Sequence, residues 1–177
     1  DLAHNRTLVS RPSAPRMVLC CLVLLFLARP APGAEGSSIA QQVVGTWDVQ
    51  SVTITSADGS VVDPFGSKPS GIIMLDTNGR YANVFGRADR PKIDAANRLA
   101  ITPGQLGAAA KEFTANFGTW SVAATEMTIT LRFVGSLDPN NEGTQATYAL
   151  ALSGNGMTFS ITLPGQRLEV VKYRRAN

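Results

Sequence analysis

From about residue 43 onward, hydrophobic and polar side chains alternate with a period of two. Residues 127–133 (MTITLRF), 148–152 (YALAL) and 157–163 (MTFSITL) place large apolar side chains at every second position. A strand with one buried face and one solvent-exposed face is typical of an antiparallel sheet. The pattern predicts strands at 44–56, 60–63, 70–76, 79–86, 117–123, 126–134, 144–152, 156–163 and 166–174, of which the second is short enough to be only a bulge or extension.

Turn signals separate these segments. Asn78-Gly79 is a hairpin signal because both residues tolerate the positive φ of a type I′ turn, and Asp58-Gly59 and Pro164-Gly165 mark further turns. Eight sequential antiparallel strands predict an all-β, up-and-down barrel, with an open two-sheet sandwich as the alternative. At eight strands the interior is either filled by side chains or holds one small ligand.

One helix is expected to interrupt the strands, at about 103–116. Thr102 can cap it and Pro103 suits its first position. Phe113 and Phe117, four residues apart, are then expected to pack against the sheet. The connection before the helix, residues 86–101, is long enough to be a lid at the barrel mouth or a solvated loop of mixed charge.

The N-terminal part has a different composition. Residues 18–28 (VLCCLVLLFLA) form an apolar run of signal-peptide length, too short for a bilayer span of roughly 20 residues. Basic Arg16 precedes it, and small residues up to Ala34 follow it. We expect residues 1–34 to be a removable signal peptide with an upstream extension, in which Met17 is the start and residues 1–16 are upstream sequence or an extended n-region. Residues 35–42 are then a polar lead-in, and residues 43–177 are the barrel domain.

Removing the leader changes which chemistry is possible. Both cysteines and the only histidine, His4, lie in residues 1–34. The same cut removes four of the sixteen basic and one of the thirteen acidic side chains, which leaves twelve of each. The formal charge of +3 therefore belongs to the leader. Nucleic-acid binding loses its electrostatic basis, and transition-metal or thiol chemistry loses its usual ligands.

Several motifs together resemble the bacterial lipocalin-like domain family. Gly45-Thr46-Trp47 opens the first strand, as the Gly-x-Trp of lipocalins does. Residues 63–66 (DPFG), 76–81 (DTNGRY), 117–122 (FGTWSV) and 135–140 (GSLDPN) follow in the family's order. The similarity covers about 43–175 and implies a calycin-type barrel with an internal cavity. It also suggests that Trp47 and Arg174 or Arg175 close one end of the barrel through a cation–π contact.

Candidate ligand-binding residues come from strand faces. Tyr81, Asn83 and Phe85 share one face of their strand, a mixture of aromatic rings and one amide that fits a ligand pocket or an ordinary core. Arg132 is either solvated or, if it points inward, able to hold a carboxylate or phosphate. The expected ligand-binding set is Tyr81, Asn83, Phe85, Arg132, Tyr148 and Phe159, with Trp47 and Arg174 as the structural closure.

No catalytic residue, metal ligand or cofactor site is predicted. Most carboxylates after residue 34 fall in turns or on polar faces, and no acid pair stands out within an apolar strand. The acidic segment 138–143 (DPNNEG) has the composition of a turn and does not match a calcium loop.

The sequence therefore favours a binding protein. We expect a secreted or periplasmic, monomeric or weakly dimeric lipocalin-like protein that carries a small hydrophobic ligand, binds no nucleic acid and has no stable membrane span in its mature form. The alternatives are an isomerase, cyclase or hydrolase that uses Asp, Glu or Tyr on a hydrophobic substrate, and a solid barrel that binds another protein.

Overall fold

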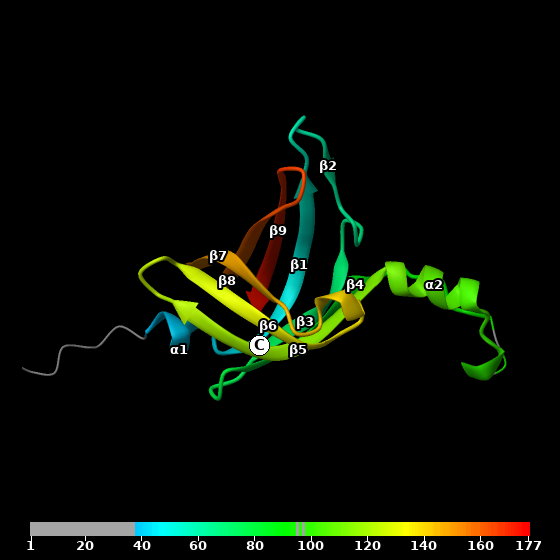
Figure 1. Ribbon diagram of the computed structural model, residues 1–177, viewed down its shortest axis with the longest axis horizontal. Coiled ribbons are helices and arrows are strands. Elements are labelled where there is room, and N and C mark those ends of the chain that lie inside the picture. The colour runs from blue at the N-terminus through cyan, green and yellow to red at the C-terminus, as the bar shows by residue number, and fades with distance from the viewer. Residues whose placement is uncertain (1–37, 95, 97) are drawn as a thin grey trace, which may run out of the picture. The chain divides into compact units, whose positions relative to one another are not determined.

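The computed structural model describes residues 38–94, 96 and 98–177, and these belong to one compact unit (Figure 1). The predicted leader, 1–34, and the start of the lead-in lie outside the described residues. The described strands are β1 (Gly45–Thr55), β2 (Val61–Val62), β3 (Pro69–Leu75), β4 (Arg80–Arg87), β5 (Phe113–Ala123), β6 (Thr128–Ser136), β7 (Gln145–Ser153), β8 (Gly156–Leu163) and β9 (Arg167–Arg175).

The strands form a closed antiparallel barrel. Each of β3 to β9 pairs with its neighbour in sequence, β1 pairs with β3, and β1 also pairs with β9, which closes the sheet (Figure 1). Strand β2 pairs only with the end of β1 among the described strands, through Ile54 with Val62 and Thr55 with Val61. The predicted all-β, eight-stranded, up-and-down barrel is confirmed, with β2 as the expected short extension.

Alternation along each strand decides what enters the barrel. In β6, Ile129, Leu131 and Phe133 are buried while Arg132 and Val134 are exposed. Two register shifts interrupt the ladders, one in β1 between Val49 and Ser51 and one in β5 between Phe117 and Gly118. Such bulges increase the local twist and bend that a closed barrel requires.

The hairpin between β3 and β4 forms where Asn78-Gly79 predicts it, but with a different turn. Gly79 has φ +76°, whereas no positive φ occurs at Asn78, so the turn is not type I′. The carboxylate of Asp76 accepts hydrogen bonds from the backbone N–H groups of Asn78 and Arg80, at 2.9 and 2.8 Å. The Asp76 side chain therefore organises a longer loop in which only the glycine needs left-handed backbone.

The helix after this hairpin is shorter than predicted. Helix α2 spans Pro103–Lys111, with Thr102 and Gln105 forming a capping box, and a short 3₁₀ turn, η1 (Arg98–Ala100), precedes it. Residues 113–117 belong to β5, because they pair with β4 from Gly86 to Ala82. The expectation that Phe113 and Phe117 pack from a helix was wrong, since the Phe117 ring lies on the outer surface of the barrel, 52% exposed.

A second helix lies in the segment predicted as a polar lead-in. Helix α1 spans Ile39–Val43, and Ser38 and Gln41 form a reciprocal capping box at its start. Val43 is fully buried and Ile39 packs against the core. The Ser-x-x-Gln pattern just before an apolar residue was the sequence signal for this helix.

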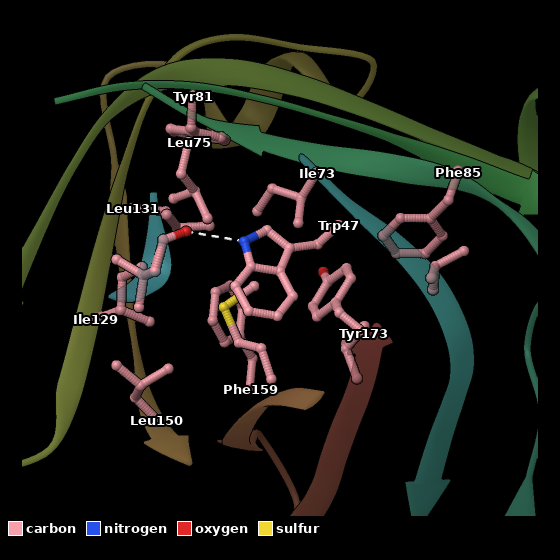
Figure 2. Close-up of a cluster of buried hydrophobic side chains, with 14 of the residues drawn as sticks. Trp47, Ile73, Leu75, Tyr81, Phe85, Ile129, Leu131, Leu150, Phe159 and Tyr173 are labelled. Carbon is pink, nitrogen blue, oxygen red and sulfur yellow. Dashed lines mark hydrogen bonds between the residues drawn. The ribbon is translucent and has the colours of Figure 1, made fainter. Parts of the chain in front are cut away.

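One end of the barrel is closed around Trp47. Its side chain is 1% exposed, and its indole Nε1 donates a 2.8 Å hydrogen bond to the carbonyl of Val43 (Figure 2). Figure 2 shows the indole ring among the buried side chains of Ile73, Phe159 and Tyr173.

Arg175, not Arg174, covers this end. Its guanidinium carbon lies 4.0 Å from the centroid of the Trp47 ring. The same group donates hydrogen bonds to the carbonyls of Val44, at 2.9 Å, and Gln42, at 2.5 Å. Arg174 is exposed, because it precedes the inward position by one residue in β9. The pairing of Trp47 with Arg174 was therefore wrong by one step of the strand, and the alternative, Arg175, makes the contact.

Candidate functional site

The opposite end of the barrel contains a partly open cavity of about 340 Å³. Its lining includes Leu163 at the end of β8, Phe65 in the loop before β3, and Asn141 in the short 3₁₀ turn η2 (Pro139–Asn141). Because Leu163 pairs with the start of β9 and Trp47 with its end, this cavity lies at the end away from Trp47. The size is near the lower limit of pockets for small organic molecules, roughly 300 Å³.

Aromatic and aliphatic residues outnumber polar residues in the lining. The aromatic members are Phe65, Phe85, Phe133, Tyr148, Phe159 and Tyr173. The aliphatic members are Val52, Leu131, Ala146, Ile161, Leu163 and Val171. The uncharged polar members are Asn83, Thr114, Asn116, Asn141, Thr144 and Gln145. The remaining member is Glu169. Apolar walls with a few placed polar groups are typical of ligand pockets.

Three aromatic side chains from adjacent strands form one wall. The Tyr148 and Phe159 rings stack with centroids 5.6 Å apart, and the Phe159 and Tyr173 rings meet edge to face at 5.3 Å. Across the lumen, Phe65 and Phe85 form another edge-to-face pair at 5.0 Å. Each pair fixes the orientation of rings whose faces and edges a ligand would touch.

Two amides face the cavity from neighbouring strands. Asn83 in β4 is directly paired with Asn116 in β5, and both line the cavity. Asn83 is only 8% exposed. The side-chain oxygens of both residues are buried and have no hydrogen-bond partner among the described residues. A buried polar atom without a partner costs about 1–3 kcal/mol, and a donor from water or from a bound molecule in the cavity would remove that cost at both oxygens.

Glu169 is the acidic group of the lining, and the sequence analysis missed it. It lies on β9, opposite Ile54 of β1 and Ile161 of β8. Burial raises the pKa of the Glu169 carboxyl. The sequence signal was its position two residues before Val171 and four before Tyr173, which places all three on the inward face of one strand.

The neighbouring phenols stay neutral. Burial, with a contribution from the Glu169 charge, raises the pKa of Tyr148 to about 12. Burial also raises the pKa of Tyr173, with smaller contributions from Tyr148 and Glu169. At neutral pH this wall therefore consists of one titratable carboxyl among neutral aromatic rings.

The structure brings together four of the six predicted ligand-binding residues. Asn83, Phe85, Tyr148 and Phe159 line the cavity. Tyr81 is buried, at 4% exposure, but belongs to the core beyond the cavity lining.

Arg132 was a wrong candidate, because it lies outside the barrel. Leu131 and Phe133 occupy the inward positions of β6, and strand alternation then places Arg132 in solvent. It cannot hold an acidic ligand in the lumen.

The described residues of the connection 86–101 do not contribute a lining residue to the cavity. Arg87 instead forms ion pairs with Asp89, at 3.2 Å, and with Glu112, at 3.6 Å. The guanidinium carbon of Arg90 lies 4.5 Å from the centroid of the Phe113 ring. These contacts attach the described part of the connection to the start of β5, and they favour the solvated-loop interpretation over the lid.

In 38–94, 96 and 98–177, no group of three or more His, Cys, Asp or Glu side chains is arranged to hold a metal ion. Within the same ranges, the helices are too short or too polar to cross a membrane.

Comparison with known proteins identifies the family. A family model described as a lipocalin-like domain matches residues 44–172, most of the chain, and the protein belongs to this lipocalin-like domain family. A barrel with a ligand-binding lumen is the general property that this fold supports. No curated protein matches the sequence.

Two solved structures resemble the barrel. One is a de novo designed fluorescence-activating β-barrel, 15% identical, with a TM-score of 0.40 over 77% of this chain and 96% of that one. The other is a redesigned β-barrel, also 15% identical, with a TM-score of 0.41 over 80% of this chain and all of that one. Neither similarity bears on what this chain binds.

Proposed function

We propose that this protein is an exported binding protein that holds a small, largely apolar molecule in the lumen of its barrel. The observation that carries the proposal is the cavity of about 340 Å³, whose lining residues are in the majority aromatic and aliphatic. Each Å² of apolar surface moved from water into such a lumen contributes about 25 cal/mol before the costs of association. Unpartnered amide oxygens at Asn83 and Asn116 would orient the ligand.

Strand β7 offers a matched pair of variants to test the lumen. Ala146 faces the cavity, whereas Ala149 on the same strand is exposed. Ala146→Phe fills the lumen, and Ala149→Phe adds the same side chain outside. The neutral fluorescent probe N-phenyl-1-naphthylamine is titrated into both variants and the parent. We expect Ala146→Phe to lose at least about 90% of the saturable signal and Ala149→Phe to retain it.

Native mass spectrometry supplies a second measurement. Protein purified from its own host is examined for a bound small molecule, which also reports the oligomeric state. A co-purifying molecule that Ala146→Phe excludes and Ala149→Phe retains supports the proposal. Probe binding that is equal in both variants, or absent from the parent, overturns it.

A second function has one observation in its favour. Glu169 is a lumen carboxyl with a raised pKa beside Tyr148, which is an arrangement suited to general acid–base catalysis on a hydrophobic substrate. An isomerase, cyclase or hydrolase of this kind would turn over members of an ester and terpenoid panel. Glu169→Gln would abolish that turnover while leaving probe binding intact, and an inactive parent protein would eliminate the hypothesis.

One observation supports the alternative hypothesis that the barrel binds another protein. The outer faces of β4, β5 and β6 expose apolar side chains, with Phe117 at 52% and Val134 at 60%. That hypothesis required a lumen packed solid, and the cavity speaks against this part of it.

Export rests on the apolar run 18–28 and the small residues after it. We expect mass spectrometry of the native protein to find a mature N-terminus close to residue 35. An N-terminus upstream of residue 18 would contradict export by cleavage.

A further inference from the structure

Besides the hydroxyl and amide groups of Thr114, Asn141, Thr144 and Gln145, the lumen presents three acceptors on which the choice of ligand depends. Two of them, the side-chain oxygens of Asn83 and Asn116, are buried acceptors without a donor among the described residues. The third, Glu169, is an acceptor whenever it is ionised. A ligand that brings donors satisfies all three, whereas a ligand that brings only acceptors leaves them unpaired.

The charge of the lumen has one sign. Among the described residues that line the cavity there is one carboxyl, Glu169, and no Lys, Arg or His. Arg175 lies at the closed end over Trp47, and Arg132 is outside the barrel. An anionic ligand would therefore meet like charge in a partly desolvated site with no cation to offset it, and a cationic ligand would meet its counter-ion.

The surroundings of Glu169 also suit a cation. The rings of Tyr148, Phe159 and Tyr173 form the aromatic wall beside it, and ring faces attract ammonium groups by roughly 0.5–2 kcal/mol each. Residues paired with Glu169 on the flanking strands are Ile54 and Ile161, so neither flank supplies a competing charge.

The ligand position follows from strand order. Around the barrel, β9 is separated from β4 by β1 and β3, and from β5 by β6, β7 and β8. Glu169 and the Asn83–Asn116 pair are therefore on opposite walls, and one ligand can reach both only with its two ends.

From these observations we infer that the ligand is an amine, which places its protonated nitrogen at Glu169 and a neutral hydrogen-bond donor toward Asn83 and Asn116. The inference rests on the proposed function and names the ligand class for the same cavity. It excludes fatty-acid-like carboxylates as the preferred ligands.

Three small probes with similar carbon skeletons test the inference. We would measure how 2-phenylethylamine, 2-phenylethanol and 3-phenylpropionate displace N-phenyl-1-naphthylamine from the full chain at neutral pH. A hydrogen bond to a charged group contributes about 1.5–3 kcal/mol, so we expect the amine to bind at least about tenfold more tightly than the alcohol, and the carboxylate to bind most weakly.

Glu169→Gln provides the matched variant, with the exposed Glu126→Gln as its control. We expect Glu169→Gln to reduce amine affinity about tenfold or more relative to the affinities for the alcohol and the naphthylamine in the same variant, and Glu126→Gln to leave these ratios as they are in the parent. In the unsubstituted protein, amine affinity should also fall when acidification protonates Glu169, because the neutral carboxyl no longer attracts the ammonium group. The phenols of Tyr148 and Tyr173 do not titrate in this range, since the pKa of each is raised.

The outcomes distinguish a failure of the amine inference from a failure of the proposed binding function. If the naphthylamine binds but the alcohol or carboxylate equals the amine, or Glu169→Gln leaves the amine unaffected, the amine inference is overturned and the binding function stands. If the naphthylamine does not bind the unsubstituted protein, the binding function itself fails. The comparison of the three probes on the unsubstituted protein does not depend on the folding of any variant.

Discussion

The two ends of this barrel are built from the same eight strands, yet their polar groups face different surroundings. At the closed end, the indole N–H of Trp47 is bonded to Val43, and the guanidinium of Arg175 is bonded to two carbonyls and lies on the indole ring. The buried hydroxyl of Tyr81 is the exception at this end, because it has no partner among the described residues and no cavity beside it. At the open end, the Asn83 and Asn116 oxygens also have no partner among the described residues, but they and Glu169 line a cavity. Paired polar groups stabilise a fold, whereas unpaired polar groups that line a cavity are accessible to a ligand.

The largest loss of stability is expected when the buried side chain at the closed end is truncated. Trp47→Ala removes a fully buried indole and should lower the free energy of unfolding by about 3–5 kcal/mol. Phe65→Ala at the open end removes a ring that is only half-buried, and should cost less than half as much. Urea denaturation of both variants measures the difference, and equal losses would contradict the contrast between the two ends.

Arg175→Ala should have the next largest effect. It removes a cation–π contact and two hydrogen bonds to backbone carbonyls, which together contribute about 1–3 kcal/mol. The neighbouring Arg174 is exposed, so Arg174→Ala should change stability by less than about 0.5 kcal/mol. Urea midpoints of the two single variants provide the comparison. A larger loss for Arg174→Ala would show that the wrong arginine has been assigned to the closure.

Glu169→Gln should stabilise the ligand-free protein at neutral pH. Burial raises the pKa of Glu169, so the folded state binds this proton more tightly than the unfolded state. The stabilising contribution of the proton is complete below the unfolded pKa and is lost as pH rises through the folded pKa. We expect Glu169→Gln to have the higher Tm at pH 7, and the difference to disappear at about pH 4 and below. A Tm advantage that is independent of pH would contradict the assignment.

Arg132→Ala should have the smallest effect. The side chain is exposed, so stability should change by less than about 0.5 kcal/mol and displacement of the naphthylamine by 3-phenylpropionate should not change. Weaker binding of the carboxylate in this variant would return Arg132 to the list of ligand-binding residues.

Local pattern predicted most of the fold. Period-two alternation and turn residues located all nine strands, and the Gly45-Thr46-Trp47 motif located the closure. Two errors have different causes. Residues 113–117 follow an alanine-rich helical segment and the Thr102–Gln105 cap, but their pairing with β4 overrides the local helical tendency. At Asn78-Gly79 the loop is longer than the predicted two-residue turn, because the Asp76 carboxylate accepts hydrogen bonds from the loop's backbone. A rule based on the turn preferences of single residues does not include these hydrogen bonds.

The candidate site was less predictable than the fold. Asn83, Phe85, Tyr148 and Phe159 were found because each lies on an alternating strand face. Glu169 was missed because a charged residue in a strand is normally exposed, and only the pairing of β9 with β1 and β8 fixes which face turns inward.

By itself, the sequence determined the strand pattern, the turns, the family and the absence of His and Cys after residue 34, because these depend on residue type and local spacing. Tertiary structure decided which end of the barrel is packed, that Arg175 and not Arg174 covers Trp47, and that Glu169 and Asn83 share one cavity. The physical reason is that inward and outward positions in a closed sheet are set by register between strands far apart in sequence, and a shift of one residue exchanges the two faces.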